Sequence, residues 1–282
     1  MATFQIDHRT TYSYNNEVYE SRNIIKMYPF KSKFLKINDH SITVTGNPII
    51  KAGKDIFGNR FGIFTRFYRH NFMTITSSME VETVYRDVLK EATSGNQTWH
   101  DVHLLGMDSS FRLFLNLEQC WVMRSIWEVV NSFPTGKMTP LETVLEFNKY
   151  VFQNFTYNPT ATLVDTPLDV VWAIKAGVCQ DFSHVLIYML RSVNIPARYV
   201  SGYICPNNNG MRGDGASHAW VEAYLPNYGW IGIDPTNNCV ANDKHVKVAI
   251  GRDYQDVAPL VGKFKGFAHQ SLHVVVTVGY QE

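Results

Sequence analysis

Three side chains in the second half of the chain have the chemistry of a nucleophilic catalyst: Cys179, His218 and Asp234. A cysteine attacks a carbonyl carbon as its thiolate, and a histidine that a carboxylate orients is the usual acceptor of the thiol proton. Nucleophile, base and acid follow one another in an order that a helix and a hairpin can bring together. The sequence therefore predicts a Cys179–His218–Asp234 triad in which the Cys179 thiolate attacks a carbonyl carbon.

Cys179 is predicted to lie in the first turn of a helix. Gly177 is well placed to end the preceding helix, and the apolar face of the next helix begins at Phe182. The unpaired N–H groups and the dipole of a first helical turn favour a thiolate, and the N–H of Cys179 could donate to the oxyanion of an attacked carbonyl. The sequence names no second oxyanion donor. The adjacent Gln180 is a candidate substrate contact.

His218 and Asp234 are predicted to meet on a β-hairpin. His218 lies at the start of the strand 217–225, and Asp234 ends the strand 229–234. The connecting turn is short enough for the two strands to pair in antiparallel orientation. Both residues then lie at the same end of the ladder, where the carboxylate would fix the tautomer of the imidazole.

Three aromatic side chains accompany the triad on this hairpin. Trp220 and Tyr224 share a face with His218 because side chains alternate along a strand, and Trp230 lies on the partner strand. They are predicted to bind substrate by shaping a groove for its acyl group. Packing in the core is the alternative for at least one of them.

Each triad residue also has an ordinary structural interpretation. A single cysteine is usually a small buried hydrophobe, a histidine at a strand start is usually polar surface, and an aspartate before a proline usually belongs to a turn. The conjunction of the three favours catalysis. Asp181, by contrast, is explained by its position in the first turn of the helix that Cys179 begins.

No metal site is predicted. Cys179 and His184 lie five positions apart, which on a helix turns them about 140° away from each other. Cys205 and Cys239 are interpreted as loop thiols without a paired base, and no Cys-x-x-Cys pair occurs. No calcium loop with spaced acids is visible, and the proposed chemistry requires no cofactor. The glycine-rich segment 210–215 is predicted to be a loop beside the site.

Composition limits the classes of partner. Of 282 residues, 45% are hydrophobic and 18% are charged, enough for a large core. The formal net charge of +1 gives no field that would attract nucleic acid or an anionic membrane. No apolar run approaches the ~18 residues of a membrane span, and the N-terminus lacks the pattern of a secretory signal. A cytoplasmic setting with free thiols is expected. The oligomeric state stays open.

Three regions follow one another along the chain. Residues 1–84 alternate between apolar and polar as half-buried strands do, with turns at Gly46-Asn47 and Gly58-Asn59, and predict a β-sandwich or small barrel. Residues 85–138 predict a connector of short helices. Residues 139–282 predict the catalytic domain, whose first helix begins at Thr139 with a capping box and a proline in the first position.

Helices precede strands in this last region. A second helix is predicted to begin at Thr166 in the same way, and the helix that Cys179 begins is predicted to stop at Pro196. Short apolar strands are predicted over 198–204, 217–225, 229–234, 246–250 and 272–278. Helices followed by antiparallel strands predict an α+β fold, in which a helix-borne cysteine lies against a sheet.

At these residues the chain resembles the transglutaminase-like superfamily, in particular its bacterial branch of cysteine proteases. The Cys, His and Asp motifs of the family occur in the family's order, as AGVCQDF at 176–182, SHAWVE at 217–222 and GWIGIDPTN at 229–237. A further matching segment, IPARYVSGY at 195–203, lies between the first two. The first region resembles the β-rich domain that precedes the catalytic domain in these bacterial proteins, notably at YSY (12–14) and DIFGN (55–59), and the segment 245–254 also fits.

The resemblance implies a papain-like transglutaminase core preceded by a β-sandwich-like domain. Its members include amine transferases, peptidases, deamidases, amidases and inactive proteins, so it leaves the reaction open. A cysteine protease or amidase with a peptide or protein substrate is the expected function. The alternatives are a protein transglutaminase that uses an amine acceptor and a non-catalytic peptide-binding module. A metal-dependent hydrolase would need a ligand cluster that the sequence does not offer.

Overall fold

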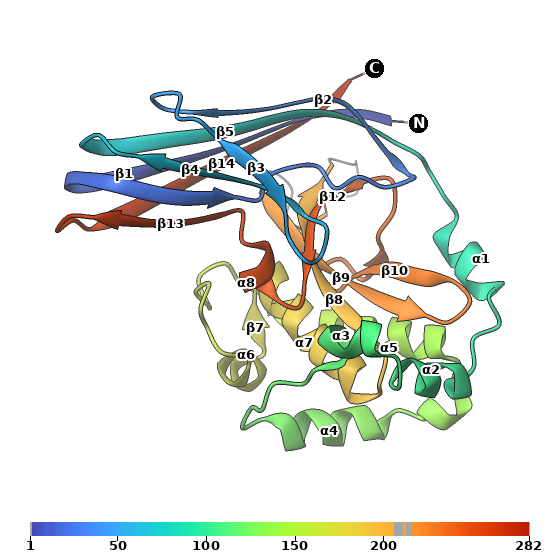
Figure 1. The fold of residues 1–282 in the computed structure, drawn as a ribbon. Coiled ribbons are helices and arrows are strands. Elements are labelled where there is room, and N and C mark those ends of the chain that lie inside the picture. Colours follow the sequence, from blue (N-terminus) through green and yellow to red (C-terminus); the bar gives the residue numbers. More distant parts are fainter. Residues whose placement is uncertain (1, 206–210, 213–215, 282) are drawn as a thin grey trace.

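The computed structural model describes residues 2–205, 211–212 and 216–281 and distributes most strands between two antiparallel sheets (Figure 1). We call the larger one, which begins with the first residues, the N-terminal sheet. Its strand order is β2 (Leu35–Val44), β5 (His70–Thr83), β1 (Ala2–Ile25), β4 (Arg60–Arg66) and β3 (Lys51–Lys54), and β13 (Leu260–Lys265) and β14 (Gln270–Gln281) also pair with β1.

The second sheet carries the hairpin of the predicted site, and we call it the catalytic sheet. Its order is β11 (Cys239–Val240), β10 (Gly229–Asp234), β9 (Ser217–Leu225), β8 (Ala197–Ile204) and β12 (His245–Gly251). A short parallel pair, β6 (Thr156–Tyr157) and β7 (Ala176–Gly177), lies apart from both. In Figure 1 the N-terminal sheet lies above and the helices below, with β8, β9 and β10 between them.

β1 is the longest strand because its alternating pattern runs almost unbroken over 24 residues. Its first half pairs with β5 on one edge and β14 on the other, and its second half pairs with β4 and β13. The strand predicted over 272–278 therefore forms within β14, but it pairs with β1 rather than with the catalytic sheet. Apolar periodicity predicts a strand and one buried face, and it does not name the partner.

Short helices connect the sheets, as predicted for 85–138. They are α1 (Val88–Thr93), α2 (Trp99–Leu105), η1 (Ser109–Phe111), α3 (Arg112–Leu115), α4 (Met123–Ser132) and η2 (Thr135–Lys137). Three further helices follow, α5 (Pro140–Asn154), α6 (Leu168–Ile174) and α7 (Cys179–Ser192), and α8 (Tyr254–Val257) comes after β12. None of the helices among the described residues is long and apolar enough to cross a membrane.

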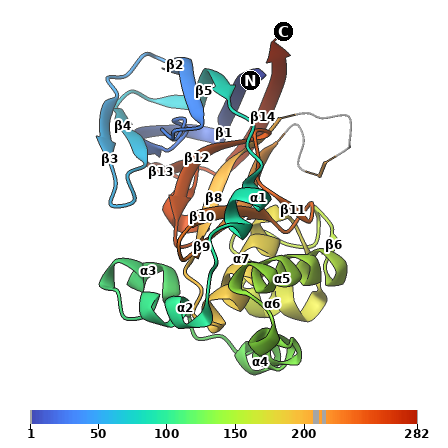
Figure 2. The ribbon, with the colours of Figure 1, turned by 90° about the vertical axis from the view of Figure 1, so that its right-hand side faces the viewer.

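α7 is the central helix of this layer. It contacts α4, α5 and α6 as well as β8 and β9, and Figure 2 shows α5, α6 and α7 close together beside the catalytic sheet. Phe182, Leu186 and Met189 on the helix are fully buried in one core with Val221 and Ala223 of β9. Burial on nearly every side fixes the helix in place, so its first residue has a defined position against the sheet.

The helix ends agree with the sequence in one case and differ in another. Thr139 caps α5 with the predicted capping box, because its hydroxyl accepts from the N–H of Glu142 at 3.2 Å and the Glu142 carboxylate accepts from the N–H of Thr139 at 2.7 Å. α6 has no side-chain cap, and the Thr166 hydroxyl instead accepts from the N–H of Leu163 at 2.8 Å.

The end of α6 also differs from the prediction for Gly177. The helix ends with Lys175 in the left-handed conformation, at φ 51°. Gly177 lies in β7, where an added Cβ would collide with the side chain of Asp181. The glycine is therefore explained by close packing before α7 rather than by the end of α6.

The turn DIFGN joins the two sheets. The carboxylate of Asp55 accepts from the N–H groups of Phe57 and Asn59 at 3.0 and 2.9 Å, which closes the turn. The Asn59 amide then donates to the carbonyl of Ile250 in β12 at 2.7 Å and accepts from its N–H at 2.9 Å. This segment of the predicted N-terminal region thus fixes the outer strand of the catalytic sheet.

Candidate active site

Cys179 is the first residue of α7, as predicted, and is partly exposed. The preceding turn is fixed by Asp181, whose carboxylate accepts from the N–H of Val178 at 2.8 Å and from the hydroxyl of Thr162 at 2.6 Å. The capping role predicted for Asp181 is confirmed. The first N–H groups of a helix lack partners within the helix, so Cys179 lies where backbone donors are available to an oxyanion.

His218 and Asp234 meet across the hairpin of β9 and β10. The two strands pair in antiparallel orientation from Leu225 with Gly229 to Val221 with Ile233. The Nε2 of His218 lies 2.9 Å from Oδ2 of Asp234, and both side chains are fully buried. The predicted proximity of the two residues is confirmed, and the carboxylate orients the ring.

Cys179 is near the His218 ring, because its charge contributes to the pKa of that residue. Burial alone would lower the pKa of His218, but the charges of Asp234 and of a Cys179 thiolate raise it to about 10. Nδ1 of His218 is buried and forms no hydrogen bond with the described residues. The ring and the sulfur therefore lie close but outside ordinary hydrogen-bond geometry, which is common for catalytic pairs before substrate binds.

The Asp234 carboxylate is held by a ring of donors. Its Oδ1 accepts from the backbone N–H groups of Thr236 and Asn237 at 2.9 and 3.2 Å, and its Oδ2 accepts from the Asn237 amide at 2.8 Å. Burial opposes its ionisation, but the charge of His218, the hydrogen bonds from His218 and His245 and the charge of His245 keep the pKa of Asp234 well below its usual range. Asn237 was not predicted as a site residue, although it belongs to the segment GWIGIDPTN.

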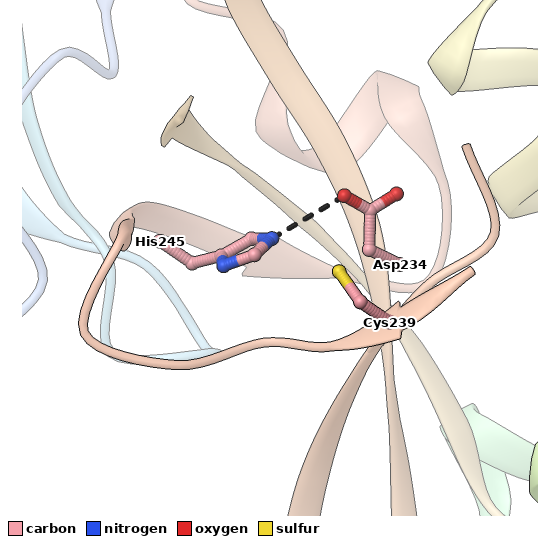
Figure 3. Close-up of side chains that lie close together, drawn as sticks. All are labelled: Asp234, Cys239 and His245. Atoms are coloured by element: carbon pink, nitrogen blue, oxygen red, sulfur yellow. Dashed lines mark hydrogen bonds and ion pairs between the residues drawn. The ribbon is translucent and has the colours of Figure 1, made fainter. Parts of the chain in front are cut away.

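His245 is the second residue that the sequence did not indicate. It begins β12, and its Nε2 lies 3.3 Å from the same Oδ2 of Asp234 (Figure 3). Cys239 of β11 also lies beside this carboxylate. One donor atom from each of Asp234, Cys239 and His245 lies within 4.8 Å of the others, a spacing that a metal ion could bridge.

The predicted substrate contacts have other partners in the structure. The Gln180 amide donates to the carbonyl of Val164 at 2.7 Å, so its donor group is already engaged. Trp220 is 1% exposed and packs with Val200 and Ile250, and its ring stacks on His218 with a centroid distance of 6.2 Å. Trp220 therefore contacts the triad from within the core.

Tyr224 and Trp230 form a pair farther along the hairpin. Their ring centroids lie 5.3 Å apart in an edge-to-face arrangement, and both pack against Phe111 of η1. The guanidinium of Arg198 lies 3.9 Å above the Trp230 ring. These rings are joined to one another and to the helical connector rather than to Cys179, and their role in substrate binding stays a prediction.

Tyr157 and Arg212 also lie near the nucleophile. Burial and the charge of Cys179 raise the pKa of Tyr157, whereas the charge of Arg212 lowers it. Both groups are therefore near enough to the Tyr157 hydroxyl to interact with it electrostatically. The backbone of Arg212 donates to Asn237 at 2.8 Å and accepts from it at 3.2 Å. Of the predicted glycine-rich loop 210–215, residues 210 and 213–215 lie outside the described residues.

Two family models match the chain. The core of the transglutaminase-like superfamily matches residues 128–235, and the bacterial transglutaminase-like N-terminal region matches residues 4–82. The first match includes all three triad positions. The second covers strands of the N-terminal sheet up to β5.

Two relatives match over most of the chain, and a third matches over part of it. An uncharacterized protein of Mycobacterium leprae (strain TN) is 32% identical over 228 residues, which are 79% of each chain. An uncharacterized protein of Mycobacterium tuberculosis (strain ATCC 25618 / H37Rv) is 30% identical over 278 residues, 92% of this chain and 86% of its own. A protein-glutamine gamma-glutamyltransferase of Pseudomonas aeruginosa is 34% identical over 87 residues, 29% of this chain and 13% of that enzyme.

A solved structure shares the fold. The crystal structure of "a Putative Cysteine Protease from Cytophaga hutchinsonii" superimposes with a TM-score of 0.78 at 24% identity, over 100% of this chain and 91% of that one. At this identity the likeness concerns the fold alone. Together with the match to the core model, it confirms the predicted α+β class, with a β-rich N-terminal region before a transglutaminase-like core.

Proposed function

Because the chain belongs to the transglutaminase-like superfamily, we propose that it is a cysteine-nucleophile enzyme that cleaves amide or peptide bonds through an acyl-thioester. The observation that carries the proposal is the contact between His218 and Asp234. That contact engages Nε2 of the ring and leaves the buried Nδ1 without a hydrogen bond among the described residues, and Cys179 is near enough for its charge to contribute to the pKa of His218. A free ring nitrogen beside the sulfur is what proton transfer requires.

The reaction follows from the positions of these groups. Nδ1 of His218 takes the proton of Cys179, and the thiolate attacks the amide carbonyl carbon, whose π electrons move to oxygen. The backbone N–H of Cys179 donates to this oxyanion. The tetrahedral intermediate collapses by breaking the C–N bond, and the imidazolium gives its proton to the leaving amine. The acyl group remains on sulfur as a thioester.

The second half of the cycle repeats the same steps with another nucleophile. His218 takes a proton from water, the resulting hydroxide attacks the thioester, and the carboxylic acid leaves as the thiol is restored. Asp234 keeps its charge throughout and stabilises the imidazolium formed in each half. Water as acceptor makes the protein a protease or amidase.

An amine acceptor is the second candidate outcome. The match to the gamma-glutamyltransferase of Pseudomonas aeruginosa, over 87 residues, favours it for the shared part of the core. A neutral primary amine would attack the same thioester and lose a proton to His218, the C–S bond would break, and the proton would return to sulfur, so that an amide forms in place of the acid and the thiol is restored. The triad serves both reactions, so access of water and amine to the thioester decides between them.

Mass spectrometry of peptide products tests the proposal. A glutamine-containing peptide library would be incubated with the wild type and with Cys179→Ala, with and without a biotinylated primary amine. Cleaved or deamidated peptides in the wild-type sample identify a hydrolase, and biotinylated peptides identify a transferase. A wild type that binds peptides but yields neither product would support a peptide-binding module and contradict the proposal.

A further inference from the structure

We propose that His245 is a positioning residue for the triad, a second imidazole donor that fixes the Asp234 carboxylate so that Asp234 can orient His218 toward Cys179. The inference rests on the proposed function, because positioning matters only if the triad reacts. His245 touches none of the reacting atoms, and it acts through Asp234 alone.

Two imidazoles share one carboxylate oxygen. Oδ2 of Asp234 lies 2.9 Å from Nε2 of His218 and 3.3 Å from Nε2 of His245, and the His245 side chain is only 1% exposed. Figure 3 shows the His245 ring directed at the carboxylate. An oxygen in this position needs both nitrogens to donate, because two acceptors cannot bond to each other.

The surroundings of His245 fix which of its nitrogens carries the proton. The backbone N–H of Asn242 donates to Nδ1 at 3.3 Å. A neutral imidazole that accepts at Nδ1 carries its hydrogen on Nε2, which is the nitrogen that faces Asp234. The edge-to-face packing of Trp220, with ring centroids 5.2 Å apart, holds the ring in this orientation. The Nε2–H of His245 is therefore a hydrogen-bond donor directed at the Asp234 carboxylate.

A metal ion is the competing explanation for this cluster. A histidine that binds metal through Nε2 has no proton there, and its Nδ1–H normally donates to an acceptor. At His245, however, Nδ1 faces a donor, the N–H of Asn242. The arrangement fits hydrogen bonding to Asp234 better.

His245 also lines a cavity, and Asp234 is not among the residues that line it. A cavity of about 330 Å³ lies between the N-terminal region and the catalytic sheet, and His245, Trp220 and Asn242 are among the residues that line it. Without the imidazole, water in this cavity could reach the carboxylate. Titratable groups face Asp234 from three strands, His218 from β9, Cys239 from β11 and His245 from β12. Of these, His245 lies on the cavity side.

The test compares two variants of nearly equal length, His245→Gln and His245→Met, since only the glutamine retains an N–H donor. The rate at which iodoacetamide alkylates Cys179 would be followed by peptide mass spectrometry between about pH 4 and pH 9. A lost hydrogen bond to a charged group is expected to move the acidic limb of this profile up by about one pH unit in the methionine variant. At about pH 6 its rate should fall about tenfold.

Three controls separate positioning from packing. His245→Gln should recover most of the wild-type profile, and Cys239→Ala, beside the same carboxylate, should leave it unchanged. Nitrogen NMR of the wild type should show the proton of His245 on Nε2, which tests the argument even if the methionine variant does not fold. A proton on Nδ1 would overturn it.

The remaining outcomes distinguish this inference from the proposed function. If wild-type Cys179 reacts no faster than Cys120 at about pH 6, the proposed function fails and the positioning role with it. If wild-type Cys179 is reactive and His245→Met keeps its profile, the positioning role alone is wrong. Protection of Cys179 by zinc chloride that disappears in Cys239→Ala would show that the cluster is a metal site and would also overturn it.

Discussion

Asn59 satisfies both backbone polar groups of Ile250, a residue 191 positions away, through two hydrogen bonds of 2.7 and 2.9 Å. Asn59 is fully buried, so an alanine in its place leaves an N–H and a carbonyl without partners. We expect Asn59→Ala to lower the free energy of unfolding by about 3 kcal/mol, measured by urea titration.

Asn16 supplies the control for this change. It is exposed and its amide makes a single bond to the carbonyl of Phe267 at 3.1 Å. Asn16→Ala should change the free energy of unfolding by no more than about 0.5 kcal/mol. Equal effects of the two substitutions would show that the turn DIFGN does not join the sheets energetically.

The His218–Asp234 pair predicts how stability depends on pH. The pKa of His218 is raised to about 10 in the folded protein from 6.5 in the unfolded chain. Its contribution is therefore fully present below pH 6.5 and is lost as the pH rises through about 10, because the folded state holds a proton that the unfolded state releases. The slope should reach about 1.4 kcal/mol per pH unit within this window.

The Asp234 carboxylate determines how stability changes at the acidic end of the pH range. The pKa of Asp234 is lowered in the folded state, so its contribution is present above its ordinary value of 3.8 and is lost as the pH falls below it. Asp234→Asn removes the charge on which both pH dependences, that of His218 and that of residue 234, rest, while keeping the shape of the side chain. Unfolding of the two proteins between about pH 3 and pH 10 should differ most near neutral pH. Parallel curves would contradict a charged pair.

Alkylation at mildly acidic pH should identify Cys179 as the activated thiol. Wild-type protein should incorporate iodoacetamide at residue 179 within minutes at about pH 6, whereas Cys179→Ala should incorporate almost none. Cys205 is buried and Cys239 has its pKa raised to about 12, so neither should replace the lost label. Equal labelling of both proteins, measured by peptide mass spectrometry, would exclude an activated Cys179.

A substitution at Gly177 is expected to disturb the start of α7 without replacing any residue of the proposed triad. An alanine there would collide with the side chain of Asp181, which fixes the turn before Cys179. We expect Gly177→Ala to lower the free energy of unfolding by about 2 kcal/mol and to slow alkylation of Cys179.

Gly136 is the matched position for comparison. An added Cβ there has no neighbour within 4 Å, so Gly136→Ala should leave the alkylation rate unchanged and alter stability by at most about 1 kcal/mol. A slower reaction in this variant would mean that Cys179 responds to stability in general rather than to the shape of its turn.

The parts of the site that the sequence predicts are those set by local patterns. A helix start and a two-stranded hairpin depend on residues close together in the chain, so the first turn at Cys179 and the pairing of His218 with Asp234 could be inferred from turns and periodicity. His245 reaches Asp234 differently. Its strand, β12, pairs with β8, and nothing in the residues around it indicates that it lies near the end of β10.

The same distinction applies to the fold. The turns at Gly46 and Gly58 were predictable because both glycines adopt φ 83°, a conformation that favours glycine. Lys175 adopts a left-handed conformation at φ 51° without being a glycine or an asparagine, so no local signal marked the end of α6. The pairing of β14 with β1 is a contact between distant segments, and a buried face alone does not specify it.

The pairing of β1 with β14 sets the order in which the molecule can be completed during synthesis. Phe4 pairs with Tyr280, so one edge of β1 stays open until β14 has left the ribosome. An open edge can pair with another nascent chain. The transglutaminase-like core can assemble earlier, because β8 to β12 and α7 are all made before β14. Protection of the open edge of β1 against aggregation therefore depends on β14, and not on the residues of the candidate active site.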